Sequence, residues 1–204
     1  MSDRYAGMPL LVHANLVSYH YPGVTNNIYI APKTFEQLAA HPNIVGCKLS
    51  HGIIDDQTLI AASPRIDHDH FYVFTGLGQN LLPVLAIGGV AAIDGLAGVF
   101  PRLVVRLYNL FVAGLESGIS KKEIQAMREL QFRICEGEKI VAKWGPVGMK
   151  EACARVWGFG SKEGGRLPLA GGFEEGDAEW NKWSELFDGL KELEEKFKSE
   201  GKEG

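Results

Sequence analysis

The chain has 204 residues, of which 46% are hydrophobic and 23% are charged, and its formal net charge is −4. This length suits one sizeable domain or two small ones, and the composition is that of an ordinary globular protein. The negative charge excludes a general attraction to nucleic acid or to anionic membranes. Three cysteines without a C-x-x-C pair favour a reducing compartment. Because there is neither a long apolar run nor a targeting pattern, we expect a cytoplasmic protein without a membrane span.

The first half of the chain alternates short apolar runs with helical patterns. Thr34 is the expected N-cap of the first helix, and Pro101 is the expected first residue of the fourth. The order β-α-β-α-β-α-β-α with short links predicts an α/β fold with parallel strands and covering helices. The predicted strands are 10–19, 43–50, 70–76 and 90–96, and the predicted helices are 32–42, 55–63, 79–89 and 101–114.

No strand is predicted after Gly118. Ser120 and Glu123 form a capping-box pattern at the start of a long helix. A second helix is expected to end at Gly158, and a Gly-rich loop follows. The last helix carries its apolar residues on one stripe, so the charges of "KELEEK" (191–196) are interpreted as a solvated face. The tail beyond this helix is expected to be frayed.

Lys48 is unexpected in "PNIVGCKLSHG" (42–52), which otherwise has the pattern of a buried strand. Because side chains alternate across a strand, Gly46 and Lys48 share one face, and Cys47 is expected in the core on the opposite face. Lys48 lies near the carboxyl end of the strand, where α/β enzymes carry their chemistry. A lysine desolvated there has a lowered pKa and can form a Schiff base with a carbonyl. The alternative is a strand-end lysine whose charge reaches solvent.

Several motifs occur together in an order that points to one family. "YHYPGVT" contains Tyr19, and "HPNIVGCKLS" contains Lys48 one βα unit later. "FTG" ends at Gly76, "GGVAAIDGLAGVFPR" contains Ile93, and "VGMKEACARVWGF" with "RLPL" closes the series. From about residue 19 to residue 169 these motifs resemble the dihydrodipicolinate synthase and N-acetylneuraminate lyase family of pyruvate-dependent Schiff-base class I aldolases.

The resemblance implies the C-terminal half of a (β/α)8 TIM barrel, strands five to eight, followed by a C-terminal helical region. It divides the chain into a poorly matching segment (1–18), a half barrel (19–117) and a helical extension (118–204). A complete barrel needs about 250 residues, and the "GTTGE" loop of the family does not occur in this sequence. We therefore interpret the chain as a truncated gene product or an incomplete gene model.

The resemblance also assigns roles to residues. Lys48 would be the imine-forming nucleophile, and Tyr19 would shuttle protons; the alternative for Tyr19 is a strand-end tyrosine with a satisfied hydroxyl. Gly76 and Ile93 would line the pyruvate pocket. The implied activity is that of a lyase that makes or breaks a C–C bond to pyruvate without a metal or organic cofactor, in a homo-oligomer (dimer or tetramer) if the barrel is complete. A catalytically inactive barrel fragment or interaction module is the alternative.

Three further positions bear on substrate and site. Val24 stands where dihydrodipicolinate synthase has a carboxylate-binding arginine, which favours a 4-hydroxy-2-oxoglutarate or 2-keto-3-deoxy sugar acid aldolase. The run "DHDH" (67–70) is either a metal cluster or a solvated turn, and its lack of helical spacing favours the turn. His51 either tunes Lys48 or belongs to the rim of the site.

Overall fold

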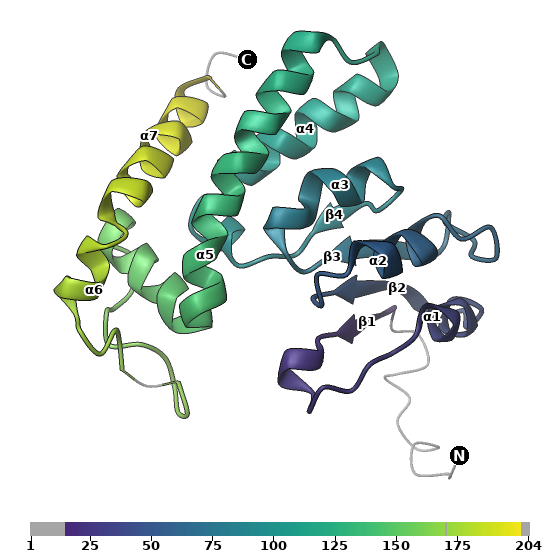
Figure 1. The fold of residues 1–204 in the computed structure, drawn as a ribbon, viewed down its shortest axis with the longest axis horizontal. Coiled ribbons are helices and arrows are strands. Elements are labelled where there is room, and N and C mark those ends of the chain that lie inside the picture. The colour runs from purple at the N-terminus through teal and green to yellow at the C-terminus, as the bar shows by residue number, and fades with distance from the viewer. Residues whose placement is uncertain (1–14, 170, 201–204) are drawn as a thin grey trace. The chain divides into compact units, whose positions relative to one another are not determined.

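The structure of the protein, a computed structural model, describes residues 15–169 and 171–200 (Figure 1). The described residues divide into two compact units, one within residues 15–75 and 83–91 and the other within residues 76–82, 92–169 and 171–200. The division into 1–18, 19–117 and 118–204 was made on the family resemblance and stays a prediction. Most of its first segment, and residues 10–14 of the first predicted strand, lie outside the described residues.

The sheet has the strand order β1-β2-β3-β4. β1 (Leu16–His20), β2 (Ile44–Leu49) and β3 (Tyr72–Thr75) are parallel, which confirms the predicted parallel α/β arrangement. β4 is only Ala91–Ala92, much shorter than the predicted strand 90–96. That prediction was wrong in extent, since Asp94 and Gly95 are poor strand residues and a 3₁₀ turn, η4 (Leu96–Gly98), follows.

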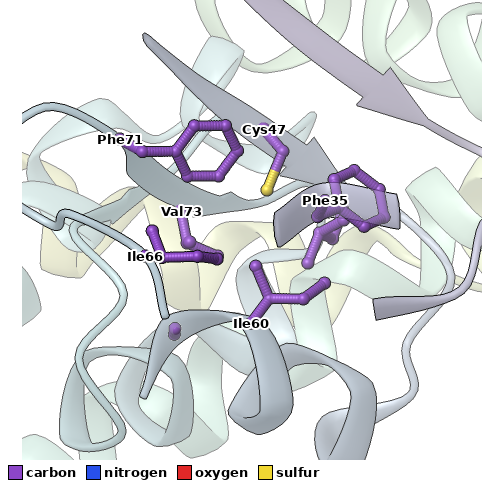
Figure 2. Close-up of a cluster of buried hydrophobic side chains, with 8 residues drawn as sticks. Phe35, Cys47, Ile60, Ile66, Phe71 and Val73 are labelled. Atoms are coloured by element: carbon purple, nitrogen blue, oxygen red, sulfur yellow. The ribbon is translucent and has the colours of Figure 1, made fainter. Parts of the chain in front are cut away.

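The core of the first unit lies between the strands and two helices, α1 (Pro32–Ala39) and α2 (Ile54–Ala61). A third helix, α3 (Leu81–Ala86), lies between β3 and β4 along the chain. Cys47 on β2 is fully buried in the core, as expected, and burial raises the pKa of its thiol to about 12. The cluster in Figure 2 therefore fixes one face of the sheet against the helices and leaves the other face for Lys48. Its members are Phe35, Cys47, Leu49, Ile60, Ala61, Ile66, Phe71 and Val73.

Helix ends follow the proline and capping signals, with one exception. Pro101 opens α4 (Pro101–Ser117), and Ser120 with Glu123 forms both hydrogen bonds of the capping box, so both predictions are confirmed. Thr34 is not the N-cap of α1. The helix begins at Pro32, because the fixed φ of proline suits the first helical position, and Ala31 is the N-cap.

The remaining helices of the second unit are α5 (Lys121–Trp157), α6 (Asp177–Asn181) and α7 (Ser184–Glu200). α5 is interrupted at Gly145, whose φ of 54° and ψ of −137° are not helical, just before Pro146. This break matches the two separate helices that the sequence predicts there. α5 ends at Gly158 in the left-handed conformation, as expected. The helices α4, α5 and α7 pack on one another, and no helix of the described residues could span a membrane.

Two glutamates of the second unit are buried, and one of them, Glu194, lies in "KELEEK", where the prediction of a solvated face was wrong at this position. Glu194 on α7 is only 2% exposed and accepts hydrogen bonds from the backbone N–H groups of Arg102 and Leu103, at 2.9 Å each.

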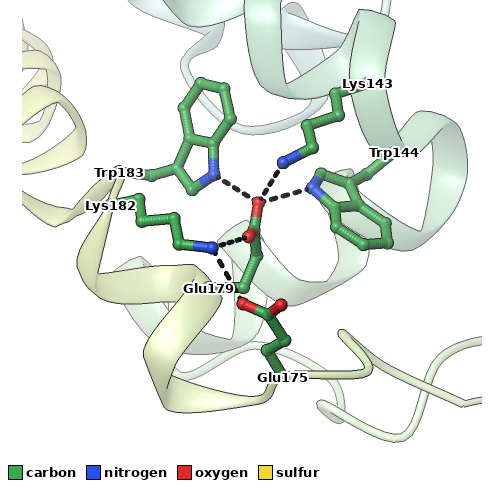
Figure 3. Close-up of polar contacts among 6 residues, drawn as sticks. All are labelled: Lys143, Trp144, Glu175, Glu179, Lys182 and Trp183. Carbon is green, nitrogen blue, oxygen red and sulfur yellow. Dashed lines mark hydrogen bonds and ion pairs between the residues drawn. The ribbon is translucent and has the colours of Figure 1, made fainter.

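Glu179 on α6 is also 2% exposed and is surrounded by donors (Figure 3). Its Oε1 accepts a hydrogen bond from Lys143 Nζ at 2.7 Å. The same oxygen accepts one from the indole N–H of Trp144 and one from that of Trp183, at 3.0 Å each. Its Oε2 accepts a hydrogen bond from Lys182 Nζ at 2.8 Å.

Candidate active site

Tyr19 and Lys48 lie next to each other near the carboxyl ends of adjacent parallel strands. Tyr19 on β1 is the register partner of Lys48 on β2. The amine Nζ of Lys48 lies 4.4 Å from the centroid of the Tyr19 ring. The side chain of Lys48 is half-buried, and Tyr19 is 51% exposed. The structure thus brings together the two residues that the resemblance assigns to imine formation and proton transfer.

The alternation of β2 explains why Lys48 avoids the core. Cys47 and Leu49 are both fully buried on the side that faces α1 and α2. Gly46 and Lys48 therefore lie on the opposite face. A Cβ atom added at Gly46 would collide with the backbone carbonyl of Tyr72 on β3. The missing side chain lets β2 and β3 approach closely beneath the lysine.

Two further residues of this face flank the pair, and the sequence analysis did not single out either as part of the site. Ser50 donates a long hydrogen bond of 3.4 Å from Oγ to the Tyr19 hydroxyl. Phe74 on β3 is the register partner of Lys48 on the side away from Tyr19. The alternation rule places Ser50 on the lysine face, and the "FYVFTG" strand offers Phe74, but the register between strands cannot be read from the sequence alone.

His20, which directly follows Tyr19 in β1, forms a ring contact with a second histidine, His51. His20 is 1% exposed, its ring centroid lies 5.0 Å from that of His51, and its Nε2 has no partner among the described residues. Burial lowers the pKa of His20, and the neighbouring Asp56 opposes this effect. Burial also lowers the pKa of His51, and the charge of His20 acts in the same direction. Both imidazoles are therefore biased toward the neutral form. The Asp56 carboxylate also accepts the Tyr29 hydroxyl at 2.8 Å.

Gly76 and Ile93 each follow directly after a strand of the sheet. Gly76 comes after Thr75, the last residue of β3, and Ile93 comes after Ala92, the last residue of β4. Both belong to the second unit, whereas Tyr19 and Lys48 belong to the first. Their assignment to the pyruvate pocket stays a prediction.

The segment "DHDH" has the contacts of a turn. The Asp67 carboxylate accepts the backbone N–H of Asp69 at 3.1 Å, and the His68 ring contacts the carbonyl of Ser63 at 3.1 Å. No cluster of three or more potential ligands suited to a metal occurs in the part of the chain that the structure describes. Val24 lies in the 3₁₀ turn η2 (Pro22–Val24) after β1 and is largely exposed. Its side chain is apolar and offers no group that could bind the carboxylate of a substrate.

Comparison with known proteins places these residues in one family. Residues 10–182 match the model of the dihydrodipicolinate synthetase family. An L-threo-3-deoxy-hexylosonate aldolase of Aspergillus niger is 30% identical over 175 residues, which cover 76% of this chain and 49% of the relative. A probable mitochondrial 4-hydroxy-2-oxoglutarate aldolase of Emericella nidulans is 28% identical over 144 residues, which cover 71% of this chain and 43% of the relative.

A solved structure agrees with this match. The putative dihydrodipicolinate synthase of Thermus thermophilus superposes with a TM-score of 0.72 at 26% identity, covering 89% of this chain and 57% of that one. The chain thus spans about half the length of the curated relatives that it matches.

Proposed function

Because the chain belongs to the dihydrodipicolinate synthetase family, we propose that Lys48 forms a Schiff base with a 2-keto acid and that the protein is a class I aldolase. The observation that carries this proposal is the adjacency of the Lys48 amine and the Tyr19 ring on paired parallel strands, 4.4 Å apart. A primary amine beside a phenol has both the nucleophile and the proton carrier that imine chemistry requires.

The neutral amine of Lys48 attacks the keto carbon, and its nitrogen loses protons while the carbonyl oxygen leaves as water. The Tyr19 hydroxyl donates and accepts protons during these steps. Once the imine has formed and is protonated, it withdraws electrons, so the C–C bond beta to its carbon breaks while the hydroxyl on the departing carbon gives its proton to the Tyr19 oxygen. The products are an enamine of pyruvate and an aldehyde. Protonation of the enamine and hydrolysis of the imine then release pyruvate and restore the free amine. In the reverse direction the same enamine attacks an aldehyde.

The strands β1 to β4 are assigned by this proposal to strands five to eight of a (β/α)8 barrel, and the helices from α5 onward to the C-terminal extension of the family. The assignment rests on the parallel strand order and on the solved structure, of which this chain covers 57%. Carboxyl ends of parallel strands hold the chemistry in such barrels. Gly76 and Ile93 would then line the keto-acid pocket, and a complete barrel would assemble as a dimer or tetramer.

The substrate favoured by the residues is a sugar-acid or hydroxy-oxoglutarate type 2-keto acid. Val24 offers no charge to a second carboxylate. The relatives from Aspergillus niger and Emericella nidulans bear the names of aldolases of these two types. A relative from Thermodesulfovibrio yellowstonii that is 31% identical bears the name 4-hydroxy-tetrahydrodipicolinate synthase.

The test is trapping of the imine. The protein is incubated with pyruvate and borohydride, digested, and analysed by mass spectrometry. We expect a reduced pyruvate adduct on Lys48, and none on Lys48→Arg, which keeps the charge but not the nucleophilic amine. Because other lysines such as Lys33 stay in both proteins, they report nonspecific labelling. Absence of an adduct on Lys48 would leave the chain as an inactive fragment or interaction module. An adduct without release of pyruvate from either class of 2-keto acid would limit the activity to imine formation.

A further inference from the structure

Two buried carboxyl groups in the second unit lie against the same backbone position. Asp94 follows Ile93 after β4, and Glu138 lies in the middle of α5. A Cβ atom added at Gly78, in the turn η3 (Gly78–Asn80), would collide with a carboxyl oxygen of each. Three separate segments of the chain therefore converge at Gly78: the turn after β3, the turn after β4, and α5.

Glu138 joins the two turns through hydrogen bonds. Its Oε1 accepts the backbone N–H of Leu96 at 3.4 Å, and its carboxyl group is also the acceptor for the backbone N–H of Gly78. Gly78 lies close along the chain to Gly76, and Leu96 close to Ile93. A single side chain of α5 thus holds the two segments whose backbone would line the keto-acid pocket.

The Asp94 carboxyl group lacks a protein donor. Both of its oxygens are buried, and neither receives a hydrogen bond from any described donor. It lies within hydrogen-bonding distance of Glu138. Two carboxyl groups can form such a bond only if one of them carries a proton. A shared proton is therefore the arrangement that satisfies both groups.

The surroundings of Glu138 contain no compensating cation among the described residues. Burial raises its pKa to about 8, and the hydrogen bond and negative charge of Asp94 act in the same direction. Asp94 is the only charged group among the described residues that acts on Glu138. The other polar side chains that this region contributes are neutral: the Cys135 thiol of α5 contacts the Gln79 carbonyl at 3.7 Å, and Gln131 donates to the carbonyl of Gly78 at 3.1 Å. From the other elements Leu96 of η4 and Leu190 of α7 approach α5 at Gly137, and both are apolar.

We propose that Glu138 is a positioning residue that, while it shares one proton with Asp94, clamps the turns after β3 and β4 in the geometry that binds the keto acid. This role rests on the proposed function, because the turns carry Gly76 and Ile93. The clamp itself is a property of the second unit alone.

The pH dependence of the clamp follows from the sign of the shift. The carboxyl of Glu138 has a folded pKa above its ordinary value, so the folded protein binds this proton more tightly than the unfolded chain does. The resulting stability is complete below a pH of about 4.5, falls as the pH rises, and is lost above about 8. At alkaline pH the two carboxylates repel each other, and the turns are released.

Hydrogen exchange tests the clamp without reference to activity. The amides of Gly78 and Leu96 are followed between pH 6 and pH 9 in the full chain, each corrected for the intrinsic pH dependence of exchange. We expect their protection to fall about tenfold for each pH unit above the transition in the wild type. In Glu138→Gln, which stays neutral, the corrected protection should not change with pH. The same pH dependence in both proteins would overturn the proposal.

Two other variants guard against misinterpretation. Asp94→Asn supplies an N–H donor to Glu138, so its transition should move to lower pH, which keeps the test valid if Glu138→Gln does not fold. Glu136 is on the same helix, and its carboxylate forms an ion pair with Arg133 at 2.9 Å. Glu136→Gln removes this carboxylate and should show the same transition as the wild type. A shift of the transition in Glu136→Gln equal to that in Asp94→Asn would assign the effect to general charge and contradict the clamp.

Imine trapping then links the clamp to the site. In the wild type the pyruvate concentration that gives half-maximal adduct should rise above pH 8, whereas the maximal rate changes less, because Lys48 and Tyr19 are untouched. In Glu138→Gln this concentration should stay constant with pH. If the exchange experiment succeeds but the wild type gives no adduct, the proposed function fails and the clamp stands. If an adduct forms but its pH dependence is the same in both proteins, the positioning role is excluded.

Discussion

At the residue scale, the site depends on how Lys48 is flanked. Its register partners are Tyr19 on β1 and Phe74 on β3, so the residue beside Lys48 on each neighbouring strand is aromatic. Aromatic faces favour a cation, but their bulk also limits access of water to the amine. Tyr19 is the only one of the two rings with a hydroxyl, and its hydroxyl receives only the long bond from Ser50 among the contacts described above. This hydroxyl is therefore available for the proton transfer that the proposed function assigns to it.

Removing this hydroxyl tests its role. We expect Tyr19→Phe to slow formation of the Lys48 adduct by about 10²-fold, in the usual range for loss of a general acid or base. The melting temperature should change little, because the ring is half-exposed and its hydroxyl receives only the long 3.4 Å bond from Ser50 among the contacts described above. Stopped reactions with borohydride measure the rate. Ser50→Ala is the comparison: it keeps the hydroxyl of Tyr19 and should slow the reaction much less, and an equal loss in both would deny Tyr19 a special role.

How much of this site the sequence could predict depends on the distance between residues along the chain. The face of Lys48 and the burial of Cys47 follow from alternation within one strand. The pairing of Tyr19 with Lys48 required the family motifs, because periodicity carries no register between strands. The Asp94–Glu138 contact was not predicted, since neither residue was singled out by a motif and the two lie on separate elements.

At the element scale, α4 is capped by a residue far away in the chain. Phe100, its N-cap, makes no side-chain hydrogen bond to the helix. The carboxylate of Glu194 on α7 accepts the N–H groups of Arg102 and Leu103 instead, and it also lies 3.3 Å from the Arg102 guanidinium. Negative charge at a helix N-terminus is favourable. A sequence pattern cannot reveal such a cap, because capping rules consider only neighbours in the chain.

Loss of this cap should destabilise the helix bundle. We expect Glu194→Ala to lower the free energy of unfolding by about 1–2 kcal/mol, the usual cost of a lost cap. Urea unfolding followed by circular dichroism measures the change. Glu195→Ala, at the next and exposed position of the same helix, should change it by less than about 0.5 kcal/mol. Equal effects at the two positions would show that helix propensity, rather than capping, is responsible.

Glu179 on α6 joins α5 to the link between α6 and α7 in the same unit. Hydrogen bonds from Lys143 and Lys182 hold the pKa of its carboxyl well below the usual range, and the indole donors of Trp183 and Trp144 add to the effect. A lowered pKa stabilises the fold above the unfolded value of 4.5, and this stability is lost as the pH falls below it.

This sign gives a pH-dependent prediction. At pH 7, Glu179→Gln should melt about 5 °C lower than the wild type, because the amide brings donors of its own to a site filled with donors. The difference should shrink between pH 4 and pH 2 as the wild-type carboxyl becomes protonated. Calorimetry across this range measures it, with Glu195→Gln as the matched exposed control. A difference that does not depend on pH would exclude the ionised carboxylate as its source.

At the scale of the whole molecule, β1 is an end strand of the sheet that the described residues form. Leu16 and Val17 of this strand are each 44% exposed. An end strand with apolar side chains can pair with another chain. The chain also spans about half the length of the curated relatives that it matches. The sequence predicted the parallel order of the strands because each βα unit is local, whereas the arrangement of the helices after residue 118 depends on buried polar contacts that no pattern encodes.

The end strand should make this chain associate. We expect sedimentation velocity to show self-association that increases with protein concentration. Val17→Lys places a charge on the strand and should suppress it, since natural edge strands use lysine for this purpose. Lys33→Arg, which keeps the charge of an existing surface lysine on α1, is the control and should associate as the wild type does. Association that is unchanged in Val17→Lys would exclude β1 as the contact.

All four tryptophans of the chain, at positions 144, 157, 180 and 183, lie in the second unit. Selective excitation of the indoles therefore observes the helical unit alone, while the first unit contributes only tyrosine emission. Two of these indoles donate to Glu179, so their emission should change when that contact opens. The indoles are thus an internal optical reporter of the second unit. A change in indole emission on addition of pyruvate would show that the second unit responds to the keto acid.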